Sequence, residues 1–148
     1  MQTDTSHKVE EKELRTLIEG WVKAVRAKDL DGLTSGYTQD IRSFDVVAPL
    51  QCEGAEALRQ KTKEWLSSYD GPIECELRDL TLAAGEDVAF THSLNRYAGT
   101  KRNGEKSDMW VRVTLGWKKS DGRWTVAHEH VSVPIDPETL RAELELKP

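Results

Sequence analysis

MWVRVTLGWKKSDGRWTVAHEHVSV, residues 109–133, has the pattern of two β-strands joined by the turn signal Ser-Asp-Gly at 120–122. Valine, tryptophan, threonine and leucine dominate this stretch, and these residue types favour strands. Two further β-rich runs precede it, at 73–84 and 87–98, with Ala-Gly-Glu-Asp and Arg-Asn-Gly as turn signals. Short connections between long strands predict an antiparallel meander in the C-terminal half.

The N-terminal half has helical periodicity instead. Apolar residues recur at spacings of three and four, which predicts an amphipathic helix over 9–28. Capping and stop signals predict a short second helix over 29–37 and a third over 54–69. The segment IRSFDVV at 41–47 alternates as a short strand does. Helices followed by a meander predict an α+β domain, because βαβ alternation is absent.

One domain is expected over residues 8–134, with N-terminal helices packed on a curved antiparallel sheet and a pocket between them. Residues 1–7 are expected to be a disordered tail, and 135–148 a C-terminal extension in which Pro137 could begin one more helical turn or a helix. The outer sheet face also carries apolar residues. A second copy of the chain is therefore expected to cover that face and form a homodimer.

Composition excludes several classes of partner. The chain of 148 residues has a formal net charge of −5, with both signs interspersed. Non-specific nucleic-acid binding needs a basic face, so no nucleic acid is expected. No apolar run is long enough for a membrane span, and the first residues lack a signal-peptide core, so we expect a cytoplasmic protein. Cys52 and Cys75 have no metal or redox spacing and are expected to be reduced.

The last hairpin allows two registers. A two-residue Asp-Gly turn places Trp117 on the same face as four residues of the final strand: Trp124, Val126, His128 and His130. A three-residue Ser-Asp-Gly loop places Trp117 instead with Ala127, Glu129, Val131 and Val133. We favour the three-residue loop, because it requires glycine at its third position. Glu129 then faces the helices from an apolar strip, where a carboxyl group must be paired, protonated or functional. An ion pair or the other register would explain Glu129 without a function.

Two further residues are candidates for acid–base chemistry. Asp45 lies between Phe44 and an apolar run, so its pKa could be raised and it could act as acid or base; a turn-capping role is the alternative. His92 alternates with Phe90 and Leu94 and is expected to face inward with them. It could orient a carboxylate or relay a proton, although a hydrogen-bonded core histidine is the simpler interpretation.

Aromatic residues are candidates for pocket walls. Trp21, Tyr37, Trp65 and Trp117 together suggest a site for a flat or cyclic apolar molecule, although core packing would explain any one of them. The pair His128 and His130 has a spacing that zinc sites use. Arg112 shares their face in the favoured register, so no metal site is expected.

Three segments carry a resemblance to a known family: KDLDGLTSGYTQDIRSFD (28–45), EGAEALRQ (53–60) and DGRWTVAHEHVSVP (121–134). Over roughly residues 8–134 the chain resembles the nuclear transport factor 2-like superfamily, in its SnoaL-like and ketosteroid-isomerase-like branch. The closing segment is also similar to the association domain of calmodulin-dependent kinases, which shares the fold. The resemblance implies a cone-shaped α+β fold, with helices on a strongly curved antiparallel or mixed sheet that encloses a pocket.

The resemblance also implies roles for particular residues. Asp45 matches the base of ketosteroid isomerases, and Tyr37 matches a tyrosine of their pocket network. Trp21 stands where their principal oxyanion donor, a tyrosine, is found, and the second donor falls near Val113 or Thr114. That departure argues against steroid isomerisation by their mechanism, which depends on the oxyanion hole. Glu129 matches the acid/base aspartate of SnoaL-like polyketide cyclases.

Two functions of different classes follow as expectations. The first is a cofactor-independent isomerase, cyclase or dehydratase in which Asp45, Glu129 and His92 move protons next to a carbonyl group. The second is a non-catalytic ligand-binding or oligomerisation module that uses the same cavity. Two acids at family positions favour the first, and the missing oxyanion donors favour the second.

Overall fold

The computed structural model describes residues 5–148. Its elements are α1 (Thr5–Ala27), α2 (Leu30–Thr34), β1 (Tyr37–Phe44), β2 (Cys52–Glu53), α3 (Ala55–Ser67), β3 (Glu74–Ala84), β4 (Val88–Thr100), β5 (Lys106–Ser120) and β6 (Arg123–Ser132). Helices therefore precede a long meander, as predicted. Of the tail expected over residues 1–7, residues 1–4 lie outside the described part, and residues 5–7 already belong to α1.

The helices form where their apolar spacing and caps predict them, but α2 is shorter. Helix α1 buries Leu14, Ile18 and Val25 along one stripe. The Asp29 side chain then caps α2 by accepting a hydrogen bond from the Gly32 amide at 3.1 Å. Helix α2 ends at Thr34, so Tyr37 begins β1 instead of lying on a helix face.

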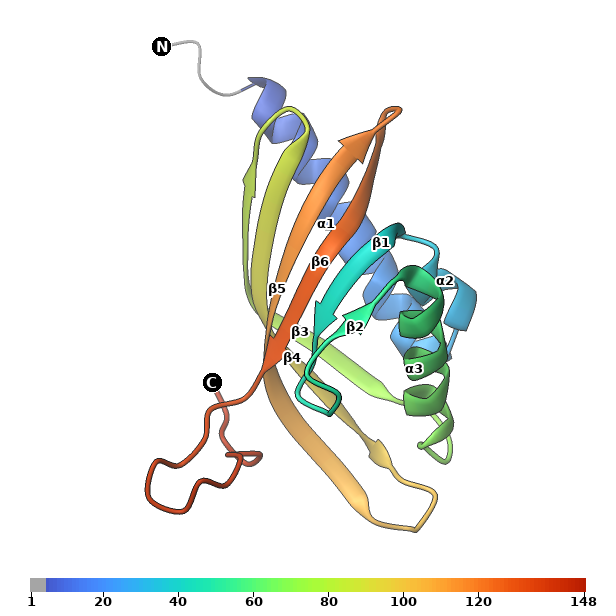
Figure 1. Ribbon diagram of the computed structural model, residues 1–148, viewed down its shortest axis with the longest axis vertical. Helices are drawn as coiled ribbons and strands as arrows, with labels where there is room; N and C mark the ends of the chain where they lie inside the picture. The colour runs from blue at the N-terminus through green and yellow to red at the C-terminus, as the bar shows by residue number, and fades with distance from the viewer. Residues whose placement is uncertain (1–4) are drawn as a thin grey trace.

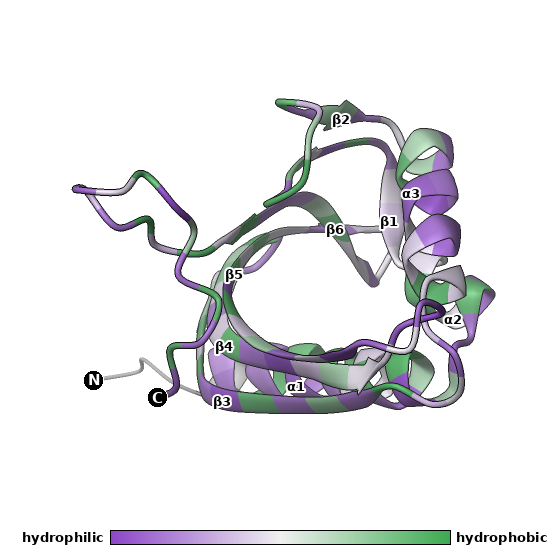
Figure 2. Ribbon diagram, turned by 90° about the horizontal axis from the view of Figure 1, so that it is seen from below, coloured by the Kyte–Doolittle hydropathy of each residue, from purple (hydrophilic) through white to green (hydrophobic). Residues whose placement is uncertain are grey.

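The six strands form one open, mixed sheet in the order β2-β1-β6-β5-β4-β3. Every neighbouring pair is antiparallel except β1 and β6, which run parallel. This pairing brings the first long strand beside the last one, so Ser43 lies opposite Glu129. The sheet curves strongly, and α1, α2 and α3 lie around its open side (Figures 1 and 2). The predicted α+β architecture with helices on a curved sheet is confirmed.

The β5–β6 hairpin combines both registers that the sequence allowed. Ser120 pairs with Arg123 across a two-residue turn, in which Asp121 (φ 52°) and Gly122 (φ 75°) are both left-handed, so the three-residue loop is wrong. Trp124 and Val126 therefore face inward with Trp117. A β-bulge at Ala127 then shifts the register.

The bulge decides where Glu129 points. Val126 pairs with Trp117, whereas His128 pairs with Gly116 and Glu129 with Leu115. The extra residue lets Val126 and Glu129 both face the helices, while His128 and His130 face outward. The predicted inward face of Glu129 is thus observed, although the turn that was expected to cause it is absent.

Strand β4 has the opposite orientation to the one expected from its hydrophobicity. Polar residues face inward from it, namely Thr91, Ser93, Asn95 and Tyr97. His92 and Phe90 are exposed on the outer face, where their rings stack. The expectation that His92 faces inward is therefore wrong. The predicted alternation of side chains along β4 is observed, but the inner and outer faces are exchanged, because the inner face of β4 lines a cavity.

Residues 135–148 contain no helix, but the Leu140 amide donates to the Asp136 carbonyl oxygen at 2.8 Å and closes a single turn with the i to i+4 bond of a helix, the shorter of the two forms expected after Pro137. Asp136 does cap one turn: its Oδ1 accepts hydrogen bonds from the amides of Glu138 and Thr139. Leu140 then adopts a left-handed φ of 59°, and the chain reverses to pair Ala142 with Ile135. Cys52 and Cys75 are buried and free. Among the described residues, no helix has the length and hydropathy of a membrane span.

Candidate functional site

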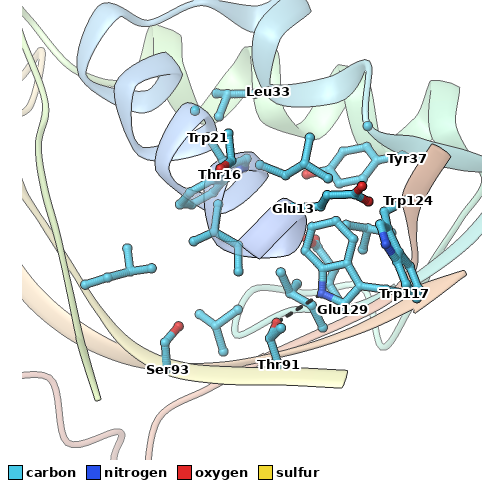
Figure 3. A pocket seen from close by; sticks show the side chains of 18 of the residues that line it. Glu13, Thr16, Trp21, Leu33, Tyr37, Thr91, Ser93, Trp117, Trp124 and Glu129 are labelled. Atoms are coloured by element: carbon cyan, nitrogen blue, oxygen red, sulfur yellow. Dashed lines mark hydrogen bonds between the residues drawn. The ribbon is translucent and has the colours of Figure 1, made fainter. Parts of the chain in front are cut away.

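A cavity of about 900 Å³ lies between the helices and the inner face of the sheet (Figure 3). Helix α1 and the α2–β1 connection form one side, and inward residues of β3 to β6 form the other. A volume of this size is in the range of sites for small organic molecules. The cavity therefore provides room for a small organic ligand between the helices and the sheet.

Aromatic side chains form much of the cavity wall. Trp21, Tyr37 and Trp117 line it, as the sequence suggested, and so does Trp124. Trp65 does not line the cavity. Its ring packs edge-on against the Tyr97 ring with centroids 5.1 Å apart, so Trp65 supports a wall residue from behind.

Of the two acids that the sequence suggested, Glu129 is the one that lines the cavity. Its Oε1 accepts a hydrogen bond of 2.7 Å from the Ser43 hydroxyl, and Ser43 is buried. Burial raises the pKa of the Glu129 carboxyl above its ordinary value of 4.5, and the charge of Asp45 acts in the same direction. The Ser43 hydrogen bond and the nearby Lys61 partly oppose this rise of the pKa. A carboxyl group whose pKa is raised holds a proton more tightly than an ordinary carboxyl group, which favours acid–base chemistry.

Asp45 is placed differently from Glu129. It is exposed, and its Oδ1 accepts a hydrogen bond from the Val46 amide at 2.7 Å. Its Oδ2 lies 3.7 Å from the Lys61 ammonium group. Asp45 is not among the residues that line the cavity, although its charge acts on Glu129. The structure therefore brings the two acids near each other but presents only one of them to the cavity.

Two phenol groups accompany Glu129. Burial raises the pKa of both Tyr37 and Tyr97 well above the ordinary value of 10.0, and the charge of Glu129 adds to the rise. Both hydroxyl groups therefore stay protonated and remain hydrogen-bond donors at any physiological pH. Tyr97 was not a candidate in the sequence analysis.

The inner side of β4 carries a row of hydrogen bonds. The Ser93 hydroxyl donates to Asn95 Oδ1 at 2.7 Å, and Asn95 Nδ2 donates to the Tyr97 hydroxyl oxygen at 3.1 Å. Because the Tyr97 oxygen is the acceptor, its own proton is left to donate elsewhere. At the other end of the row, Trp117 Nε1 donates to Thr91 Oγ1 at 3.1 Å (Figure 3). The cavity thus has a polar wall on β4.

A signal for this polar face is present in the sequence, although none of its four residues was predicted to line the pocket. Thr91, Ser93, Asn95 and Tyr97 recur at a period of two, which is the spacing of one strand face. The apolar face was taken as the inward one, so the polar face was not considered. Ser43 and Lys61 carried no local signal, because only strand pairing and the packing of α3 bring them near Glu129.

The three histidines considered above lie away from the cavity. His128 and His130 contact Phe44 on the outer face, with ring centroids 4.8 and 5.6 Å from it. His128 Nδ1 also lies 2.7 Å from the Arg42 carbonyl oxygen. No group of three histidine, cysteine or acidic residues in the described part of the chain is arranged to hold a metal ion.

Charged residues connect helix α1 to the β5–β6 hairpin beside the cavity. Glu10 accepts hydrogen bonds from Trp124 Nε1 at 2.7 Å and from the Lys119 ammonium group at 3.0 Å. These bonds hold the Trp124 ring in place as a wall of the cavity. Lys12, Glu13 and Arg123 also line the cavity, so its outer part carries both charge signs.

Solved structures similar to this chain share its fold. An NTF2-like protein of unknown function from Pseudomonas putida is 38% identical, with a TM-score of 0.87 over 95% of this chain and 98% of the other. A Novosphingobium aromaticivorans protein provisionally described as a scytalone dehydratase is 11% identical, with a TM-score of 0.78 over 87% of each chain. A Xanthomonas campestris protein provisionally described as a calcium/calmodulin-dependent kinase II association domain is 21% identical, with a TM-score of 0.70 over 81% and 84%.

The last two likenesses show the fold alone, because sequence identity is low. Among curated proteins, none matches the chain. The model of the SnoaL-like domain matches residues 14–136, which include all the inward strand residues described above. The resemblance seen in the sequence is thereby confirmed, and the chain belongs to the SnoaL-like domain family within the NTF2-like fold.

Proposed function

We propose that the protein is an enzyme that moves protons next to a carbonyl group of a small, largely apolar cyclic molecule. The observation that carries this proposal is a cavity-lining carboxyl group of raised pKa, Glu129, accompanied by two protonated phenols. The reaction class is isomerisation, cyclisation or dehydration. Proton transfers of this kind need no cofactor, because base and donors are side chains.

Glu129 is the proposed base. Its carboxylate takes the proton from the carbon next to the carbonyl group, and the electron pair of that C–H bond moves to form an enolate. In an isomerisation the protonated Glu129 returns the proton to another carbon. In a dehydration it gives the proton to a leaving hydroxyl group, which departs as water. The raised pKa of Glu129 supports both proton transfers, since the carboxyl group must first accept a proton and then release it.

Tyr37 and Tyr97 are the proposed donors to the enolate oxygen. Oriented donors that meet developing charge often supply a large part of catalysis. The sequence analysis found no donors at the positions known from ketosteroid isomerases. Phenols on β1 and β4 would take that role here, and Asn95 and Trp65 support the position of Tyr97. The aromatic wall would contact the rings of the substrate.

A non-catalytic ligand-binding module is the second candidate. Asp45 favours it, because its carboxylate is engaged by the Val46 amide and Lys61 and does not line the cavity beside Glu129. The other acid that lines the cavity, Glu13, has its Oε2 3.9 Å from the Lys119 ammonium group. Without Asp45, the proposed mechanism requires Glu129 to serve as both base and acid.

Exchange of carbon-bound hydrogen separates the two candidates. Ketones, cyclic terpenoids and aromatic polyketide-like compounds would first be screened by thermal shift and native mass spectrometry. Each binder is then incubated with the protein in D₂O, and NMR follows deuterium uptake next to the carbonyl group. Glu129→Gln is expected to slow this exchange by about 10²–10⁴-fold, which is the usual contribution of a general base. Binding should largely persist.

One control variant and one further test variant complete the experiment. Glu53→Gln removes an exposed carboxylate of β2 that does not line the cavity, and exchange should stay at the wild-type rate. Tyr97→Phe should slow exchange, because it removes a donor while keeping the ring. A ligand that binds in the cavity without any catalysed exchange would support the binding module and reject the enzyme.

A further inference from the structure

The end of strand β1 brings a charged pair close to the Glu129 carboxyl group. Ser43 lies opposite Glu129 in the parallel β1–β6 pairing, and its hydroxyl group donates to Glu129 Oε1 at 2.7 Å. Asp45 follows Ser43 by two residues, a separation of about 7 Å along an extended chain. This spacing is shorter than the Debye length at physiological ionic strength, which is about 8 Å. Salt therefore screens the Asp45 charge only in part from the strand position that holds Glu129.

Helix α3 adds the opposite charge at the same place. It packs beside β1 and β2 (Figure 1), and its Lys61 ammonium group lies 3.7 Å from Asp45 Oδ2. The two side chains are only 25% and 32% exposed, so water screens them less than it screens a fully exposed ion pair. The other Asp45 oxygen accepts a hydrogen bond from the Val46 amide at 2.7 Å. The pair is thus held by a strand end, a loop and a helix.

The two charges of the pair act on Glu129 in opposite directions. Burial is the main reason that the pKa of Glu129 is raised, and the negative charge of Asp45 raises it further. The Ser43 hydrogen bond lowers this pKa, and so does the positive charge of Lys61. Without Lys61, its partner would no longer oppose the Asp45 charge, and the Glu129 carboxyl group would hold its proton more tightly.

Other charged and titratable groups also surround Glu129. Those that line the cavity or act on the Glu129 charge are Lys12 and Glu13 of α1, Tyr37 of β1, Tyr97 of β4, and Arg123 and His128 of β6. The two phenols are uncharged at physiological pH, and the His128 ring contacts Phe44 on the outer face of the sheet. The Asp45–Lys61 pair differs from these groups because it lies at the strand end next to Ser43, which binds the carboxyl group.

We propose that Lys61 is a positioning residue of the site: paired with Asp45, it supplies the counter-charge that favours the ionised form of Glu129, which is the form that can accept a proton. Asp45 is then the partner of Lys61 and not a second acid for the ligand. The role of Glu129 as a base rests on the proposed function, whereas the charge arrangement concerns the carboxyl group itself and can be measured without any ligand.

NMR titration of the ligand-free chain tests the charge arrangement. Carbon-13 labelling of glutamate makes the carboxyl signals visible, and the signal missing from Glu129→Gln identifies Glu129. Lys61→Met is expected to raise the pKa of Glu129, because the Asp45 charge is left without its partner. Asp45→Asn is expected to lower this pKa, because the Lys61 charge is then unopposed. The double variant should titrate between the two single variants.

Two matched variants separate the effect of charge from that of structure. Lys63→Met removes the same charge from an exposed position of α3 two residues away, and Lys61→Arg keeps the charge. In both variants Glu129 should titrate close to wild type. A Glu129 pKa that is unchanged in Lys61→Met, that moves equally in Lys63→Met, or that rises in Asp45→Asn would overturn the proposal.

Deuterium exchange with the same variants distinguishes the role of Lys61 from the proposed function. If Glu129 is the base, the pH midpoint of catalysed exchange should follow the NMR titration and be higher in Lys61→Met and lower in Asp45→Asn. Titrations that shift as expected, without catalysed exchange in any variant, would support the charge arrangement and reject the enzyme. Catalysed exchange together with unshifted titrations would overturn the role of Lys61 alone.

Discussion

The two faces of strand β4 differ in a way that organises the molecule. The inner face carries Thr91, Ser93, Asn95 and Tyr97 around a cavity; hydrogen bonds join Ser93 to Asn95 and Asn95 to Tyr97, and a separate one joins Trp117 to Thr91. The outer face carries Phe90, His92 and Leu94, of which Phe90 and His92 are exposed. In an ordinary half-buried strand the apolar face would lie inside. Here the polar face lies inside because it borders a cavity, and the apolar face lies outside.

The largest difference between the two faces of the sheet is expected at two glycines, Gly99 of β4 on the inner face and Gly116 of the neighbouring strand β5 on the outer face. A Cβ atom on Gly99 would lie 2.8 Å from Tyr69 Cδ1 and 3.1 Å from the Pro72 carbonyl oxygen. A Cβ atom on Gly116, on the outer face, would meet only His128 atoms, the nearest at 3.5 Å. Gly99→Ala should lower the free energy of unfolding by about 1–3 kcal/mol through overpacking.

Gly116→Ala is the matched substitution and should be neutral or slightly stabilising, because alanine costs less backbone entropy than glycine in a strand. Urea denaturation of both variants measures the difference. Equal losses at the two positions would contradict the view that only the inner face is closely covered.

The hydrogen-bonded row gives the next largest expected effect. Asn95→Leu removes the acceptor of Ser93 and the donor to Tyr97, and Asn95 is only 3% exposed. We expect a loss of about 1–2 kcal/mol in stability, together with weaker binding of any cavity ligand. Leu94→Asn is the outward neighbour and should change stability by less. The two variants would be compared by thermal unfolding, and a larger effect of Leu94→Asn would reject the assigned faces.

A smaller effect is expected at Thr91. Thr91→Val keeps the shape but removes the acceptor of the buried Trp117 N–H group, at a cost of about 1 kcal/mol. Thr114→Val makes the same change on the exposed outer face and should stay within about 0.5 kcal/mol of wild type. Chemical denaturation measures both. If Thr91→Val were neutral, the hydrogen bond would contribute nothing to stability.

The pH dependence of Glu129 gives the finest test. Its folded-state pKa is raised above 4.5, so the folded chain retains a proton that the unfolded chain releases. Wild-type stability should therefore fall as pH rises from about 4.5 through the raised pKa. Glu129→Gln cannot ionise at this position and should lack this decline. Its stability relative to wild type should therefore be higher at neutral pH than below pH 4.5. Thermal unfolding over a pH series checks the sign, and an opposite slope would contradict the assigned burial.

Much of the fold could be predicted from the sequence, because its signals are local. Helical spacing gave α1 and α3, and turn residues gave the boundaries of the meander, since both depend on residues close in the chain. The terminal segments were harder. Local signals allowed either a helix or a single helical turn after Pro137, and only a single turn forms, because Leu140 adopts a left-handed φ and the chain reverses there.

The candidate site was only partly predictable. Glu129 was identified from the sequence, but its inward direction depends on the β-bulge at Ala127. Because of this extra residue, Val126 and Glu129 on either side of the bulge both face inward. Asp45 was identified as a second acid, yet its hydrogen bond to Val46 and its contact with Lys61 arise from a loop and a helix that meet only in the folded chain. His92 was assigned to the wrong face, because apolar neighbours were taken to mark the interior.

The sequence by itself determined that N-terminal helices precede an antiparallel meander, and that one acid on the last strand and several tryptophans were candidates for a pocket. These conclusions follow from periodicity and turn chemistry, which act over a few residues. Only the tertiary structure decided which face of each strand meets the cavity, that Ser43 holds Glu129, and that Tyr37 and Tyr97 accompany it. The reason is physical: a strand alternates its side chains in either case, and only its packing partners distinguish inside from outside.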